Sequence, residues 1–152
     1  MSTMPTFPEY LERILKARVY DVAIETPLDP APRLSARLGN RLLLKREDLQ
    51  PVFSFKVRGA FNKLAELTPE VRARGVICSS AGNHAQGVAL AARSFGTRAV
   101  IVMPSSTARI KFEAVKALGG EVILHGEDYD EAYAHARTIA DEKQLTFVHA
   151  FD

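Results

Sequence analysis

The fold of this 152-residue chain is decided by the stretch Val76-Ile77-Cys78-Ser79-Ser80-Ala81-Gly82-Asn83-His84-Ala85-Gln86-Gly87-Val88. It begins with a short apolar run, passes through a small polar loop and continues with helical periodicity. Three further apolar runs begin near Ala99, Val122 and Phe147, at nearly equal intervals. Continuous apolar runs are typical of parallel strands that helices cover on both faces. The sequence therefore predicts an α/β fold with an open, mainly parallel sheet built from βαβ units.

The segments between these runs carry apolar residues at helical spacing. The predicted buried faces are Val88, Ala91, Ala92 and Phe95; Phe112, Val115 and Leu118; and Tyr129, Ala132, Tyr133 and Ala136. Asp128, with Glu131 three residues later, predicts the start of the last helix.

Ahead of the sheet, the sequence predicts an N-terminal helical arm. Thr6 and Glu9 form a capping-box pattern at the start of a helix that runs to about Arg18. Its apolar stripe is Phe7, Tyr10, Leu11, Ile14 and Leu15. A proline-containing connector is expected from residue 21 to 32, followed by a short helix to residue 38 and a strand at residues 41–45.

The next stretch, residues 54–60, places a lysine at the start of a helix. The predicted buried face is Val57, Ala60, Phe61 and Leu64, on a helix that runs from Ser54, as N-cap, to about Leu67. Lys56 would lie in the first turn, where the helix dipole and nearby basic residues favour a neutral amine. Those basic residues are Lys45, Arg46 and Arg58. A neutral lysine can form Schiff bases with aldehydes, although an ordinary solvated lysine fits the same local pattern.

The loop after the first buried strand is a candidate ligand site. Ligands bind at the carboxyl ends of strands in open parallel sheets. Gly82 would let the backbone approach a ligand, and the N–H groups at the following helix start favour an anion such as a carboxylate. In the alternative interpretation, Ser79, Ser80 and Asn83 only cap that helix. Val88 stands where a Walker loop requires lysine, which argues against a nucleoside triphosphate site.

Bulk properties exclude several other classes. The chain is 47% hydrophobic and 25% charged, with a net charge of +2, which does not indicate nucleic-acid or membrane-surface binding. Residues 1–5 lack the pattern of a secretory signal. The single cysteine, Cys78, fits a reducing compartment, so a cytoplasmic location is expected. The four histidines lack the spacing of a metal motif, and no metal site is predicted.

The stretches 79–87, 45–48 and 50–56 together resemble the threonine dehydratases, in particular their biosynthetic, isoleucine-pathway branch. These enzymes belong to the second structural class of pyridoxal-phosphate enzymes, and the resemblance extends from Tyr10 to Asp152. It implies the small subdomain of the tryptophan-synthase-β-like fold. Residues 1–52 would form an arm and the first strand of the catalytic domain, and residues 53–152 the small α/β subdomain.

The resemblance also implies roles for individual residues. Lys56 would be the catalytic residue and would bind pyridoxal 5'-phosphate covalently, with Phe55 and Asn83 as further cofactor contacts. The substrate carboxylate would be held by Ser80, Ala81, Gly82, Asn83 and His84. The implied reaction is deamination of L-threonine to 2-oxobutanoate and ammonia, with L-serine as a further candidate substrate and Lys56 as general base. A homo-oligomer is expected for the full-length protein.

Two alternatives stay open. A serine/threonine dehydratase or serine racemase would share this fold and these motifs. A non-catalytic α/β module is a different class of interpretation. It gains weight because the chain lacks the glycine-rich loop that binds the cofactor phosphate in this family. We therefore expect a fragment that, alone, binds the cofactor weakly and turns over little.

Overall fold

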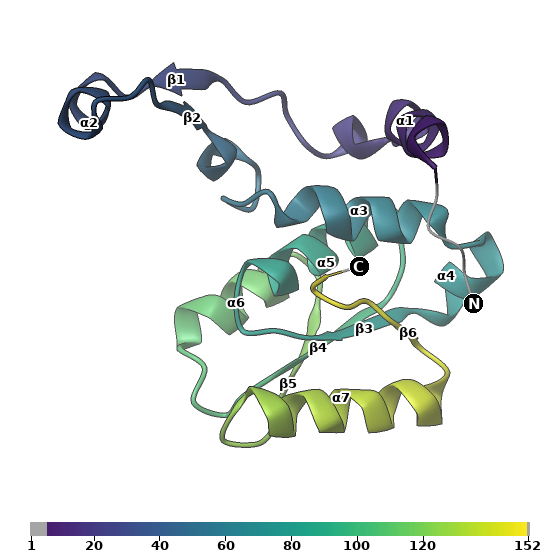
Figure 1. Cartoon of the computed structure of the whole chain (residues 1–152). Helices are drawn as coiled ribbons and strands as arrows, with labels where there is room; N and C mark the ends of the chain where they lie inside the picture. The colour runs from purple at the N-terminus through teal and green to yellow at the C-terminus, as the bar shows by residue number, and fades with distance from the viewer. Residues whose placement is uncertain (1–5, 152) are drawn as a thin grey trace.

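A four-stranded parallel sheet forms the centre of the chain, whose computed structural model describes residues 6–151 (Figure 1). Its strands are β3 (Val76–Ser79), β4 (Ala99–Met103), β5 (Glu121–Leu124) and β6 (Thr146–Phe147). They lie in the order β5-β4-β3-β6, and every neighbouring pair is parallel. The predicted α/β class and parallel sheet are thus confirmed. The interpretation of residues 1–5 lies outside the described part of the chain.

Burial varies across the sheet. Every residue of β3 and β4 is buried, as the apolar runs predict. In β5, by contrast, Glu121 and Leu124 are exposed and the two residues between them are half-buried. Both residues of β6 are half-buried as well. The prediction of burial on both faces is wrong for β5 and β6, because these two strands lie at the edges of the sheet.

Helices cover both faces of the sheet (Figure 1). Three of them lie on one face: α3 (Lys56–Glu66), α5 (Asn83–Ser94) and α6 (Arg109–Ala117). The opposite face is covered by α7 (Tyr129–Lys143). A shorter helix, α4 (Pro69–Arg74), connects α3 to β3. None of the described helices is long and apolar enough to cross a membrane.

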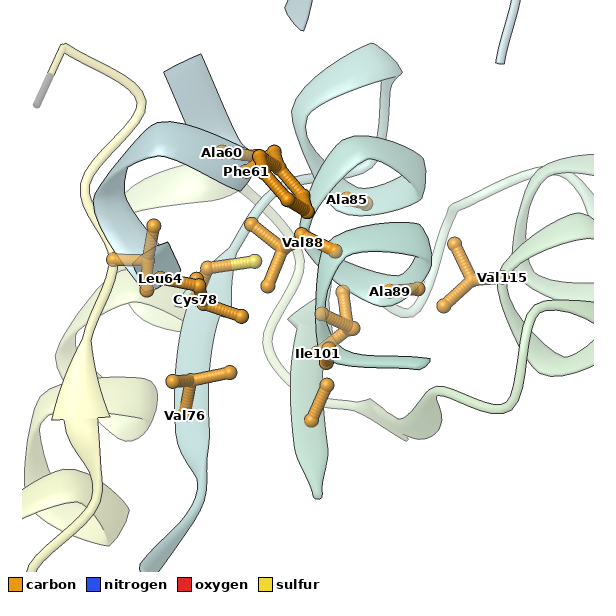
Figure 2. Close-up of a cluster of buried hydrophobic side chains, with 14 of the residues drawn as sticks. Ala60, Phe61, Leu64, Val76, Cys78, Ala85, Val88, Ala89, Ile101 and Val115 are labelled. Carbon is orange, nitrogen blue, oxygen red and sulfur yellow. The ribbon is translucent and has the colours of Figure 1, made fainter. Parts of the chain in front are cut away.

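Alternation along the strands divides the core in two. Val76 and Cys78 pack toward α3 and α5, whereas Ile77 packs toward α7, as the period of a strand requires. Figure 2 shows the first of these clusters, in which side chains from α3, α5 and the strands meet. The predicted faces of α3, α5 and α6 supply this cluster. Ala132 and Ala136 of α7 belong to the other cluster, whereas Tyr129 is 46% exposed.

The contact between α3 and α5 is close because α5 carries a glycine. A Cβ at Gly87 would lie 3.0 Å from the carbonyl oxygen and 3.2 Å from the carbonyl carbon of Lys56. Around it, Ala60 and Phe61 of α3 face Ala85 of α5 (Figure 2). The absence of a side chain at residue 87 therefore allows α5 to approach the first turn of α3.

The N-terminal arm, residues 6–52, lies beyond α3 (Figure 1). It contains α1 (Phe7–Lys16), β1 (Leu28–Pro30), α2 (Pro32–Leu38) and β2 (Leu43–Lys45), with 3₁₀ turns at Val19–Asp21 and Glu47–Leu49. The pairing of β1 with β2 is antiparallel. The sequence predicts only a connector where β1 lies. That prediction is wrong because β1 is defined by pairing with a distant segment and not by local pattern. The boundary proposed at residues 52 and 53 stays a prediction.

The first helix begins as predicted but presents its apolar stripe to solvent. The Thr6 amide donates to Glu9 Oε2 at 2.6 Å. The exposed apolar residues of the arm include Phe7, Tyr10, Leu11, Ile14, Leu15, Leu43 and Leu44. Both α1 and β2 therefore expose apolar surface.

A polar cluster attaches the arm to α3. Glu47 accepts from Arg58 Nε at 2.8 Å and from Thr26 Oγ1 at 2.6 Å. The hydrogen bond from Arg58 is the main reason that the pKa of Glu47 falls from 4.5 to about 2. Beside it, the buried amide of Gln50 donates to Ile24 O and accepts from Ile24 N. These bonds fix the segment that leads into α3.

Replacing Glu47 tests this cluster through the pH dependence of stability. Because the folded-state pKa of Glu47 is lowered, its contribution is fully present above pH 4.5 and is lost as the pH falls toward about 2. Glu47→Gln should lower the free energy of unfolding at neutral pH by about 2 kcal/mol and should flatten the acid decline. Urea titrations between neutral and acid pH measure both. The control Glu113→Gln, in an exposed pair with Lys116, should change little. An unchanged acid decline in Glu47→Gln would contradict the assignment.

Replacing Gly87 tests the close approach of the two helices. Gly87→Ala gains about 1 kcal/mol of helix propensity but forces a methyl group against the backbone of Lys56, which costs about 1–3 kcal/mol. We expect a net loss of about 1 kcal/mol, measured as the urea midpoint. Gly59→Ala, at an exposed glycine within α3, is the matched control and should be neutral or stabilising. Equal effects at both glycines would show that the helix contact is not strained.

Candidate active site

The candidate site lies where the strand order of the sheet reverses. The chain proceeds outward from β3 to β4 and β5, and then returns to place β6 on the other side of β3. The carboxyl ends of β3 and β6 are therefore adjacent, and Val148 continues their pairing through a hydrogen bond from its amide to Ile77 O. Such a switch point is where ligands bind in open parallel sheets.

Lys56 is the first residue of α3 and points toward this edge of the sheet. Its Nζ donates to Ala150 O at 2.7 Å. The ring centroids of Phe55 and Phe151 each lie 5.6 Å from the same Nζ. Local sequence explains the start of the helix, because Ser54 Oγ accepts from the Lys56 amide at 3.2 Å. The predicted cap is nevertheless displaced by one residue, since Phe55 occupies the N-cap position with a helical backbone and without a side-chain cap bond.

The basic residues that the sequence places near Lys56 are engaged elsewhere. Arg58 pairs with Glu47 at 2.8 Å, and Arg46 pairs with Asp29 and Asp48 at 2.8 and 2.7 Å. Lys45 donates to a backbone carbonyl of the arm. The carboxylates balance both guanidinium charges, which weakens the predicted contribution of like charge at Lys56.

A cavity of about 180 Å³ adjoins the lysine side chain. It is lined by Phe55, Lys56, Gly59, Ala60, Lys63, His84, Val148, His149, Ala150 and Phe151. Three residues predicted from the sequence, Phe55, Lys56 and His84, thus share one cavity. Ser80, Ala81, Gly82 and Asn83 do not line it; they form the adjoining loop and the first residue of α5.

This loop leaves the start of α5 open. Gly82 occupies the N-cap position, and no described side chain caps the helix. Ser80 Oγ instead accepts from the Gly82 amide at 3.2 Å. The alternative in which Ser79, Ser80 and Asn83 serve as helix caps is therefore wrong. A Cβ at Gly82 would meet no atom within 4 Å, so the loop has room beside its backbone.

His84 is held in a fixed orientation in the first turn of α5. It is buried, and its Nε2 lies 3.0 Å from Val148 O. Because a carbonyl only accepts, Nε2 carries the proton in this contact. The histidine therefore joins the start of α5 to the segment that follows β6.

Other reactive groups lie apart from the cavity. Cys78 is fully buried in the core, and burial raises the pKa of its thiol, so this cysteine behaves as the expected small apolar residue. Within residues 6–151, no three histidine, cysteine, aspartate or glutamate side chains are grouped so that they could hold a metal ion.

Sequence reasoning missed the segment after β6, residues 148–151, which supplies four of the lining residues. Its predicted strand ends at Val148, and nothing in the local pattern marks the following residues. The strand-end rule that identified the loop after β3 would have found them, had it also been applied after β6.

Comparisons with known proteins agree with this geometry. Residues 19–152 match the family described as pyridoxal-phosphate dependent enzymes. Over 147 residues the chain is 60% identical to the biosynthetic L-threonine dehydratase IlvA of Burkholderia multivorans. The aligned region covers 95% of this chain and 29% of that relative. Among solved structures, the processed form of threonine deaminase isoform 2 from Solanum lycopersicum has a TM-score of 0.91 and 50% identity, covering 100% of this chain and 43% of that one. Maize serine racemase has a TM-score of 0.86 and 32% identity, and the match covers 91% of this chain and 43% of the racemase.

The chain thus spans less than a third of the length of the curated relative quoted above. The roles of the individual site residues stay predictions, while the family expected from residues 45–56 and 79–87 is confirmed. Because the match covers residues 19–152, including Lys56 and the loop after β3, this chain belongs to the family of pyridoxal-phosphate-dependent enzymes.

Proposed function

We propose that this chain supplies the lysine and the substrate loop of a threonine ammonia-lyase, which converts L-threonine to 2-oxobutanoate and ammonia with pyridoxal 5'-phosphate. The observation that carries the proposal is the position of Lys56. Its amine reaches a cavity at the switch point of the sheet, beside the uncapped start of α5. The 60% identity to a relative named as a biosynthetic threonine dehydratase supports the choice of substrate.

The residues around Lys56 fit the aldehyde end of the cofactor. The cavity combines a primary amine with an aromatic side chain, Phe55, and with small residues of α3, Gly59 and Ala60. This lining suits a flat ring attached to the lysine. Phe55 and Asn83 are the proposed further contacts of the ring. When bound, the cofactor supplies an electron-accepting ring that makes the α-proton of the amino acid acidic.

The chain's own groups then divide two tasks. Lys56 Nζ accepts the α-proton as general base, because Lys56 lines the cavity at the start of α3 and is the lysine proposed to hold the cofactor. The start of α5 binds the substrate carboxylate through the backbone N–H groups near Ser80, Ala81, Gly82 and Asn83, where the helix dipole favours an anion. His84, held by Val148 O, keeps this turn in place next to the lysine.

A serine racemase or serine/threonine dehydratase is the second candidate, and the observation that favours it is the likeness to maize serine racemase. A non-catalytic module is the outcome to be expected if Lys56 cannot react with the cofactor. Homo-oligomer formation remains a prediction. So does a cytoplasmic location, which rests on the single buried thiol.

Covalent attachment of the cofactor to Lys56 is the first test. Incubation of the chain with pyridoxal phosphate, reduction with borohydride and peptide mass spectrometry should place the label on Lys56. Lys56→Ala should lose it. Lys63→Ala, at the other lysine of the cavity, should retain the label on Lys56. Labelling spread evenly over exposed lysines would favour the non-catalytic module.

Turnover is tested in a chimera in which residues 1–152 replace the matching segment of the Burkholderia multivorans relative. With Lys56 intact it should produce 2-oxobutanoate from L-threonine, and Lys56→Ala should lower kcat by a factor of at least about 10². Parallel assays with L-serine and D-serine distinguish dehydratase from racemase. A chimera that interconverts the serine enantiomers without eliminating threonine would contradict the proposed substrate.

Gly82→Ala tests the carboxylate loop separately from the lysine. The added methyl group meets no atom of the chain within 4 Å, so folding and cofactor attachment should be unchanged. The methyl group would project beside the N–H groups proposed to bind the carboxylate, so KM for threonine should rise about tenfold or more. An unchanged KM in the chimera would remove this loop from the substrate site.

A further inference from the structure

We infer that His149 is a positioning residue for Lys56: its imidazole holds a turn that presents the carbonyl of Ala150 to the lysine amine. The inference extends the proposed function, because it concerns the same lysine. It arises from the segment of residues 148–151, to which neither the sequence pattern nor the family description assigns a role.

The turn is defined by one hydrogen bond. The amide of Phe151 donates to His149 Nδ1 at 3.3 Å. An acceptor at residue i that binds the amide of residue i+2 is the geometry of an Asx turn, in which an aspartate or asparagine oxygen takes this place. Here the imidazole nitrogen does so. The carbonyl of Ala150, between the two residues, is thereby turned toward Lys56 Nζ, 2.7 Å away.

The two ends of the segment are held differently. At one end, Val148 is 1% exposed and bonded to both Ile77 and His84. At the other end, Phe151 is 87% exposed, so burial does not hold it. Its described ring contacts are with His149, 5.2 Å between centroids, and with Lys56 Nζ at 5.6 Å. Ala150 is half-buried, so the turn at His149 matters most for Phe151 and for the orientation of the peptide between residues 150 and 151.

His149 is itself supported from the opposite side of the sheet. Its ring lies edge-on to Tyr133 of α7, 6.1 Å between centroids, and 6.4 Å from the ring of Phe147. The imidazole thus connects the aromatic residues at the start of α7 to the turn over Lys56.

This arrangement has a consequence for the reactivity of Lys56. The Nζ atom donates to a carbonyl and lies near two aromatic rings. Together these contacts fix the side chain against residues 150 and 151, so the amine has to move away from them to reach an electrophile elsewhere in the cavity. The turn therefore holds the amine in a waiting position, and weakening the turn should make Lys56 more available.

The experiment measures acylation of Lys56 by acetic anhydride in the cofactor-free 152-residue chain, followed by peptide mass spectrometry. Exposed Lys111 of α6 provides an internal reference for reagent concentration. His149→Ala removes the acceptor of the turn and should raise the rate at Lys56, relative to Lys111, about fivefold. This is the factor that a hydrogen bond of typical net strength contributes.

Three further variants test whether the turn, and not simple packing, restrains Lys56. His149→Asn restores an acceptor for the Phe151 amide and should return the rate to the parent value, although it lacks the ring. His135→Ala, a histidine of α7 outside the cavity, is the matched control and should leave the rate unchanged. Circular dichroism and urea midpoints confirm that each variant is folded. Phe151→Ala, at an exposed position, serves as a second variant and should also raise the rate.

Three results would overturn the inference. They are equal acceleration in His149→Ala and His149→Asn, no acceleration in His149→Ala or in Phe151→Ala, and acceleration at all lysines alike. None of them bears on the proposed function, because the readout needs no cofactor. Failure of Lys56 to attach pyridoxal phosphate, in the separate borohydride experiment, would instead contradict the proposed function and leave the turn intact.

Discussion

The packing of α3 on α5 is the contact on which the candidate site depends. Lys56 begins one helix, and the proposed substrate loop leads into the other, so the distance between the two helices sets the distance between the lysine and that loop. Gly87 permits the approach because it has no side chain beside the Lys56 carbonyl, and the cluster around Phe61 and Val88 holds it (Figure 2). Well-packed apolar cores resist small displacements, which gives the two helix starts a fixed relation.

The order of the strands supplies the remaining part of the site. If β6 followed β5 outward, its carboxyl end would lie far from Lys56. Placing it beside β3 instead brings residues 148–151 to the lysine and allows Val148 O to bind His84. One topological step therefore joins three segments that are distant in sequence, namely the starts of α3 and α5 and the end of β6. Parallel sheets with a switch point repeatedly form ligand sites for this reason.

Most of the fold could be predicted from the sequence, because its strands and helices follow local patterns. The apolar runs located all four parallel strands, and the helical faces supplied the core residues. Three of the failures share one physical cause. The strand β1 exists through its pairing with β2, the exposure of β5 follows from its place at the edge of the sheet, and the segment after Val148 acquires its role only next to Lys56. Each depends on contacts between distant segments, about which single-sequence periodicity carries no information.

The backbone and the amine of Lys56 are restrained to different degrees, and this difference would suit the proposed role, in which the lysine exchanges partners. The backbone is fixed by the Gly87 contact, by Ser54 Oγ and by the polar cluster around Glu47 that anchors the preceding segment. The amine is held by one carbonyl and two largely exposed rings. Such contacts are individually worth about 1 kcal/mol, so they can be replaced by a bound ligand without disturbing the core. A rigid helix start with an exchangeable side-chain end would position Lys56 as the proposed nucleophile and still leave its amine free to react.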